Sequence, residues 1–193
     1  SNITVSVAEM LVRLNKNAGM QKETQTMLNK AMDYLSKETI KQVEKLKEME
    51  KMGQTVTFPG LSTLQFLYLN AISSTPQSHT TTTAYLIDLL KKDIKKQSVY
   101  EKALTAIVLA KNGLQKKGGE YVESLKQYTV YTEEQGRYYD TSRAAYSWRD
   151  YRIPTQVAAL EAISELNAAD KSTIEEMQQW LLYQKRTQSW DTP

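Results

Sequence analysis

The sequence contains no cysteine and only one histidine, His79. Without cysteine there are no disulfides, thiolate metal sites or cysteine nucleophiles. The absence does not distinguish an oxidising from a reducing compartment, because chains without cysteine occur in both. A zinc site needs several converging ligands, and His79 lies alone in a polar segment. A Ser–His nucleophile would need the same residue and an acid that cannot be singled out. We therefore expect no catalytic residue, no metal and no cofactor, and the chain is not predicted to be an enzyme.

Glycine and proline are also scarce, with 7 Gly and 4 Pro in 193 residues, which favours long helices over a many-turned β-sandwich. No apolar run approaches the roughly 18 residues of a membrane span, so none is predicted. The net charge of +3 comes from 25 basic and 22 acidic residues that are mixed along the chain. No basic face stands out, and we expect no nucleic-acid partner. Ser1 and Asn2 resemble the remnant of a removed tag, so a targeting segment can have been lost with it.

Most of the chain has apolar residues at helical spacing. A capping box at Ser6-Val7-Ala8-Glu9 predicts a first helix, with Met10, Leu11 and Leu14 on its apolar face. Capping boxes at residues 98–101 and 172–175, and Pro154, predict three more helix starts. Further helices are expected at residues 22–52, which a break at 36–39 would divide, at 61–72 and at 84–94. Gly113, Gly118 and Gly119 are expected to separate a helix around residues 103–108 from another around 122–125.

Residues 128–152 differ from the rest because polar and aromatic residues alternate there. The pattern predicts a small β-hairpin or an extended excursion between helices, with a turn at Glu133-Glu134-Gln135-Gly136. Two interpretations of the aromatic residues are open, a surface for a partner or packing on helix ends, and we favour packing. The candidate interaction surface comprises Tyr138, Tyr139, Tyr146, Trp148 and Tyr151. Arginines at 137, 143, 149 and 152 lie among these rings and could stack on them.

Other polar groups do not predict chemistry. Glu175 and Glu176 are adjacent on a helix and point apart, while Glu133 and Glu134 are expected to be solvated in a turn. Gly118-Gly119 lacks both the G-x-G-x-x-G context and a preceding strand, so it does not predict a phosphate site. The lysines of residues 91–96 are interpreted as a solvated helix face.

About eight amphipathic helices with short links predict antiparallel neighbours and therefore stacked helical hairpins. We expect an all-α fold, a partial α/α toroid or superhelix with a small β-hairpin near residues 128–152, in a single domain over residues 1–193. Asp191-Thr192-Pro193 is typical of a helix start with no helix after it. We therefore expect the sequence to stop inside its parent domain.

Four segments of the last third carry a family resemblance: residues 132–139 (TEEQGRYY), 146–162 (YSWRDYRIPTQVAALEA), 177–182 (MQQWLL) and 187–193 (TQSWDTP). In this order they resemble the helical toroid domain of bacterial alpha-2-macroglobulin-like proteins, particularly the large ones of Bacteroidetes. The resemblance covers residues 128–193 and is only architectural over residues 1–127.

The resemblance implies a thioester-domain fold in a large secreted or periplasmic, often lipid-anchored parent that inhibits endopeptidases by conformational trapping. Neighbouring β-sandwich domains and, indirectly, target proteases would be its partners. Thioester members carry Cys-x-Glu-Gln, whereas Thr132 stands where Glu134-Gln135 would require the Cys, so no thioester residue is carried over. Two alternatives remain open. One is a helical-repeat adaptor that binds peptides through the aromatic stretch, and the other is a toroid lyase or transferase, for which no D-x-D-D cluster is present.

Overall fold

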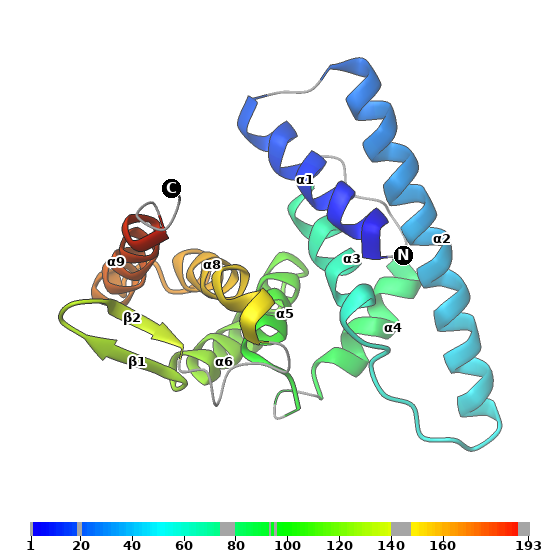
Figure 1. Cartoon of the computed structure of the whole chain (residues 1–193). Coiled ribbons are helices and arrows are strands. Elements are labelled where there is room, and N and C mark those ends of the chain that lie inside the picture. Colours follow the sequence, from blue (N-terminus) through cyan, green and yellow to red (C-terminus); the bar gives the residue numbers. More distant parts are fainter. Residues whose placement is uncertain are drawn as a thin grey trace. The chain divides into compact units, whose positions relative to one another are not determined.

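The computed structural model describes residues 2–18, 21–73, 80–92, 94, 96–139 and 148–188. Within them lie eight helices and one two-stranded antiparallel sheet (Figure 1), so the prediction of an all-α fold with a small β-hairpin is confirmed. The contacts divide the chain into two compact units, an N-terminal unit Ser1–Asp93 and a C-terminal unit Ile94–Pro193. The single domain and the toroid stay predictions.

Four helices form the N-terminal unit: α1 (Asn2–Ala18), α2 (Lys22–Lys51), α3 (Leu61–Ile72) and α4 (Thr80–Leu90). The long helix α2 contacts the other three, and α1 also packs on α3. The predicted break at residues 36–39 is wrong, because α2 continues through it. Thr39 is buried there, and its hydroxyl donates to the Leu35 carbonyl oxygen at 2.7 Å, which satisfies the group inside the helix. Gly53, with φ +79°, follows the end of α2.

The first helix differs from its prediction in both start and orientation. Helix α1 begins at Asn2, so Ser6 lies inside it and is not a cap. Its buried face contains Val5, Ala8, Leu11 and Val12, whereas Met10 and Leu14 are 54% and 49% exposed. The helix has apolar residues on two sides, and packing on α2 and α3 decides which side is covered.

The C-terminal unit contains α5 (Val99–Lys111), α6 (Gln115–Lys126), β1 (Thr129–Thr132), β2 (Gly136–Tyr139), α8 (Trp148–Leu166) and α9 (Lys171–Gln188). Helix α5 packs against both α6 and α8, and residues 102–110 are all buried, so it is the centre of this core. Gly118 was expected to separate helices but lies within α6. A Cβ there would be 2.8 Å from both the Ala106 carbonyl oxygen and Leu166 Cδ2, so glycine permits the close approach. The turn after α5 lies at Gly113, with φ +83°.

Helix caps in this unit follow one prediction and contradict another. The predicted cap at Ser98 is confirmed, because the Glu101 N–H donates to Ser98 Oγ at 3.2 Å. Helix α9 begins at Lys171 instead of after Ser172, and the Thr173 N–H donates to Asp170 Oδ1 at 3.4 Å. Asp170 is therefore the cap, and the predicted capping box is wrong.

The hairpin is shorter than the predicted excursion. Strands β1 and β2 pair in antiparallel register from Thr129↔Tyr139 to Thr132↔Gly136, and the intervening residues form the predicted turn. Helix α8 already begins at Trp148, so Pro154 lies inside it and does not start it. Pro154 is in the second turn, so α8 lacks the intrahelical hydrogen bond that an N–H at this position would otherwise donate. No helix in the described part of the chain is long and apolar enough to cross a membrane.

Candidate functional site

The β-hairpin lies directly on α9, and Gly136 is the point of closest approach. Its φ of +84° is in the left-handed region that favours glycine. A Cβ at this position would collide with the Glu176 carbonyl oxygen and would lie 3.1 Å from the Trp180 backbone nitrogen. Position 136 therefore requires glycine both for its backbone conformation and for the space available.

Arg137, the residue after Gly136 on β2, links the hairpin to α9. Its Nε donates to Glu176 Oε2 at 2.6 Å, and Nη1 donates to Thr129 Oγ1 at 3.1 Å on the paired strand. The guanidinium carbon also lies 5.5 Å from the centre of the Tyr131 ring. The side chains of Arg137 and Glu176 are both partly buried, so this ion pair is better shielded from solvent than the exposed pairs along α2.

Trp180 is the aromatic centre of the contact and is 1% exposed. The Tyr138 ring stacks on it with centroids 6.2 Å apart and an interplanar angle of 20°. The Arg152 guanidinium from α8 lies 5.1 Å from the indole centre. Strand β2, α8 and α9 therefore meet at this one side chain.

A buried glutamine joins the same three elements. Gln156 of α8 donates through Nε2 to the Arg137 carbonyl oxygen at 2.9 Å and to the Met177 carbonyl oxygen at 3.3 Å. Gln156 was not among the predicted site residues. Its spacing from Ala159 and Ile163, both buried on α8, is the signal that would have placed it on the inner face.

Two residues of the predicted interaction surface, Tyr138 and Tyr139, lie on strand β2. Tyr138 stacks on Trp180, and Tyr139 is buried, so Tyr139 is part of the core and not an exposed contact. Burial raises the pKa of the Tyr139 hydroxyl, which stays neutral at physiological pH. Trp148 and Tyr151 lie in the first turn of α8 with side chains outside the described set, and Tyr146 lies outside the described residues.

The polar groups that could suggest catalysis are dispersed in the described chain. Glu133 and Glu134 are exposed in the hairpin turn, Glu175 is exposed on α9, and Glu176 is paired with Arg137. No group of three or more potential metal-ligating side chains occurs among the residues that the structure describes. His79 lies outside them. The arrangement around Trp180 is thus a packed junction of donors, acceptors and rings.

No family model, curated protein or solved structure matches the chain.

The C-terminal unit also buries an amine that the sequence analysis did not find. Lys102 is 3% exposed in α5, and its ammonium donates to Ser124 Oγ at 2.9 Å and lies 4.5 Å from the Tyr128 ring centre. Among the described residues no carboxylate pairs with it. Hydroxyl and ring contacts replace water around the charge, which makes the group a structural link between α5 and the end of α6.

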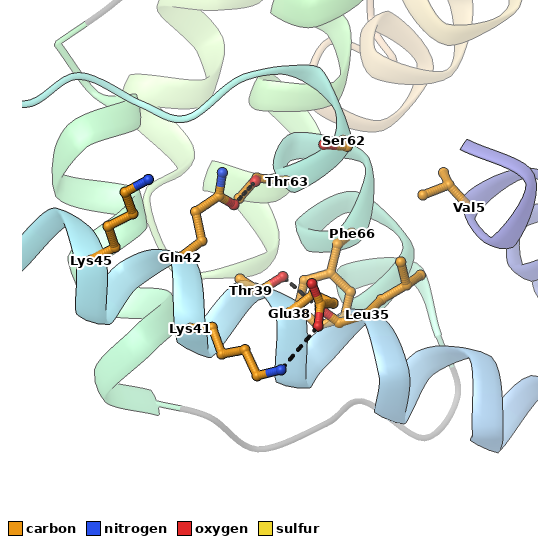
Figure 2. A pocket seen from close by; sticks show the side chains of 10 residues that line it. All are labelled: Val5, Leu35, Glu38, Thr39, Lys41, Gln42, Lys45, Ser62, Thr63 and Phe66. Atoms are coloured by element: carbon orange, nitrogen blue, oxygen red, sulfur yellow. Dashed lines mark hydrogen bonds and ion pairs between the residues drawn. The ribbon is translucent and has the colours of Figure 1, made fainter. Parts of the chain in front are cut away.

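The N-terminal unit contains an open groove with a volume of about 450 Å³ (Figure 2). It is lined by the start of α1, the middle of α2 and the first turns of α3, with these residues: Val5, Leu35, Glu38, Thr39, Lys41, Gln42, Lys45, Ser62, Thr63 and Phe66. Within the lining, Thr63 Oγ1 donates to Gln42 Oε1 at 2.7 Å, and Lys41 pairs with Glu38 at 3.4 Å. The groove is therefore mixed in polarity and open to solvent.

The cap of α9 makes the C-terminal unit sensitive to acid. Asp170 Oδ2 lies 2.7 Å from the Lys126 ammonium, and the hydrogen bond from Lys126, followed by that from Thr173, lowers the pKa of Asp170 to about 2. A carboxyl group whose pKa is lower in the folded state stabilises that state at pH values above its unfolded pKa, which is about 4. This stabilisation is lost as the pH falls from about 4 through about 2. The side chain of Asp170 remains partly solvated, so we expect it to contribute about 1 kcal/mol to the free energy of unfolding at pH 7.

We predict that Asp170→Asn lowers the free energy of unfolding of the C-terminal unit by about 1 kcal/mol at pH 7 and by much less at pH 2. Urea unfolding followed by tryptophan fluorescence reports on this unit, because all 3 tryptophans lie in it. The control is Asp88→Asn, which removes an exposed ion pair with Lys91 in the other unit. An equal loss from Asp170→Asn at both pH values would contradict the assignment.

Proposed function

We propose that the chain is a non-catalytic helical part of an alpha-2-macroglobulin-like protein and contributes to endopeptidase inhibition by conformational trapping, without a thioester in this segment. One observation carries the proposal. Three of the segments that resemble the family contact one another between the hairpin, α8 and α9: Gln156 bonds the carbonyl oxygens of Arg137 and Met177, and Trp180 contacts Tyr138 and Arg152. The proposal is supported by this meeting of the segments on which the resemblance rests.

In this proposal the helical part acts as a rigid body docked on neighbouring β-sandwich domains and moved when a target protease cuts elsewhere. Ile153 and Val157, one turn apart on α8, are 38% and 37% exposed, and Leu182 on α9 is 56% exposed. Apolar side chains of this kind are suited to contact with neighbouring domains. The proposed location is periplasmic, cell-surface or secreted.

Incubation with trypsin and with elastase tests the lack of acylating chemistry. Because Glu134-Gln135 has no cysteine before it, we expect cleavage fragments and no species of combined mass after denaturation. Intact mass spectrometry and denaturing electrophoresis make the measurement. A protease adduct that survives denaturation would contradict the proposal, as would an open reading frame that carries this sequence without macroglobulin-like β domains.

A second candidate function is a helical-repeat scaffold that binds partners through its aromatic residues. Tyr131 is the observation that favours it, since this ring is exposed on β1 beside the Arg137 guanidinium. Alanine replacement of Tyr131 tests this candidate, because Tyr131 is exposed, whereas Tyr139 is in the core and Tyr138 stacks on buried Trp180. Loss of folding supports a packing role, whereas loss of partner binding by a folded variant supports the scaffold. The toroid lyase or transferase alternative has no comparable observation in its favour.

A further inference from the structure

The groove of the N-terminal unit has two chemically different ends (Figure 2). Lys45 and Gln42 lie toward one end, and the apolar side chains of Phe66, Leu35 and Val5 lie toward the other, with Thr39 and Glu38 of α2 between them. Leu35 and Lys45 are both on α2, and their separation along the helix axis is about 15 Å at a rise of about 1.5 Å per residue. An occupant must therefore satisfy polar groups at one end and apolar groups at the other.

The polar end presents donors without a matching anion. Lys41 is paired with Glu38, but no carboxylate of the described residues pairs with the exposed ammonium of Lys45. The Gln42 amide oxygen is already occupied by the hydrogen bond from Thr63, so its Nε2 remains as the donor. Thr63 is itself buried, which fixes the orientation of that amide. An ammonium beside an oriented amide donor favours a carboxylate as the acceptor.

We propose that this groove binds an extended polypeptide segment that places a carboxylate side chain at Lys45 and Gln42 and an apolar side chain beside Phe66. An extended chain rises about 3.4 Å per residue, so residues four positions apart lie roughly 14 Å from each other with their side chains on the same face, which matches the distance between the two ends. A volume of about 450 Å³ suits such a short segment. A simple anion would leave the apolar end unoccupied. The site lies outside residues 128–193, and it is independent of the proposed family.

The test uses an acetylated, amidated pentapeptide with leucine first, glutamate last and three alanines between them. Titration into the whole chain labelled with ¹⁵N is expected to shift amide resonances of α2 residues 35–45 and of the start of α3. Because the contact is small and partly solvated, the dissociation constant is expected to be on the order of 1 mM. Lys45→Gln should weaken binding by about 3- to 10-fold. The control Lys37→Gln, on α2 outside the lining, should leave it unchanged.

A second peptide with glutamine in place of glutamate completes a double-mutant cycle. The affinity of the glutamine peptide for the native chain should be as low as that of the glutamate peptide for Lys45→Gln. Its affinity for the Lys45→Gln variant should be only slightly lower again. Acetate that shifts the same resonances with equal affinity would overturn the proposal in favour of a simple anion site. Shifts outside the groove, or equal binding of both peptides, would also overturn it.

Discussion

Gly136→Ala is expected to lower the free energy of unfolding of the C-terminal unit by about 3 kcal/mol. About 1 kcal/mol comes from forcing an L side chain into the left-handed region, here a φ of +84°. The rest comes from a collision of the new Cβ with the Glu176 carbonyl oxygen, a backbone atom that cannot move without bending α9. Urea unfolding monitored by tryptophan fluorescence measures the loss.

Gly119→Ala is the matched control for this prediction. Gly119 lies inside α6, its φ is not positive, and a Cβ there meets nothing within 4 Å. Alanine is favoured over glycine in a helix, so this variant is expected to be more stable by up to about 1 kcal/mol. If the two substitutions change stability in the same direction and by the same amount, the seating of the hairpin on α9 is wrong.

Trp180→Ala is expected to have the other large effect, a loss of about 3–5 kcal/mol. The indole is almost fully buried, and its removal takes away the stacking partner of Tyr138 and the ring beneath Arg152. Trp180→Phe should lose much less, about 1–2 kcal/mol, because it keeps a ring and the indole Nε1 has no hydrogen-bond partner among the described residues. Thermal unfolding followed by circular dichroism measures both variants.

The control for Trp180 is Leu182→Ala on the same helix. Leu182 is 56% exposed, so its truncation is expected to change stability by less than about 0.5 kcal/mol. A Trp180→Ala variant as stable as Leu182→Ala would show that the junction of hairpin, α8 and α9 contributes little to folding.

The parts of the fold that were predicted correctly depend on neighbours in the sequence. The span of α3, the extent of α2, the cap at Ser98 and the hairpin turn each follow from local spacing or from turn chemistry. Such signals are complete within a few residues, so no knowledge of the rest of the chain is needed to interpret them.

The parts that were missed depend on contacts between distant residues. Packing on α2 and α3 decides that Val5 and Val12 face inward on α1 while Met10 faces solvent. Position 118 inside α6 requires glycine because Ala106 and Leu166 approach it closely from other helices. Neither approach is encoded in the glycine's own neighbours. The cap of α9 also lies at Asp170, two residues before the serine that the capping-box pattern selected.

The candidate site shows the same division. The aromatic composition of residues 128–152 predicted an interaction surface that includes Tyr138, Tyr139 and Trp148. Tyr139, however, is a core residue. Gln156 and Lys102 were not noticed, since glutamine and lysine on a helix are usually solvated. Their burial follows from carbonyl and hydroxyl acceptors on other elements, namely Arg137 and Met177 for Gln156 and Ser124 for Lys102. The groove, too, exists only where three helices meet.

Native-state hydrogen exchange tests most directly the central claim, that the hairpin and α9 form one packed body around Trp180. If Gly136, Arg137 and Gln156 join them as described, the interstrand amides of residues 129–139 should open with nearly the same free energy as the amides around Met177 and Trp180. Hairpin amides that exchange at the rate of an unstructured peptide, while those of α9 stay protected, would contradict the account.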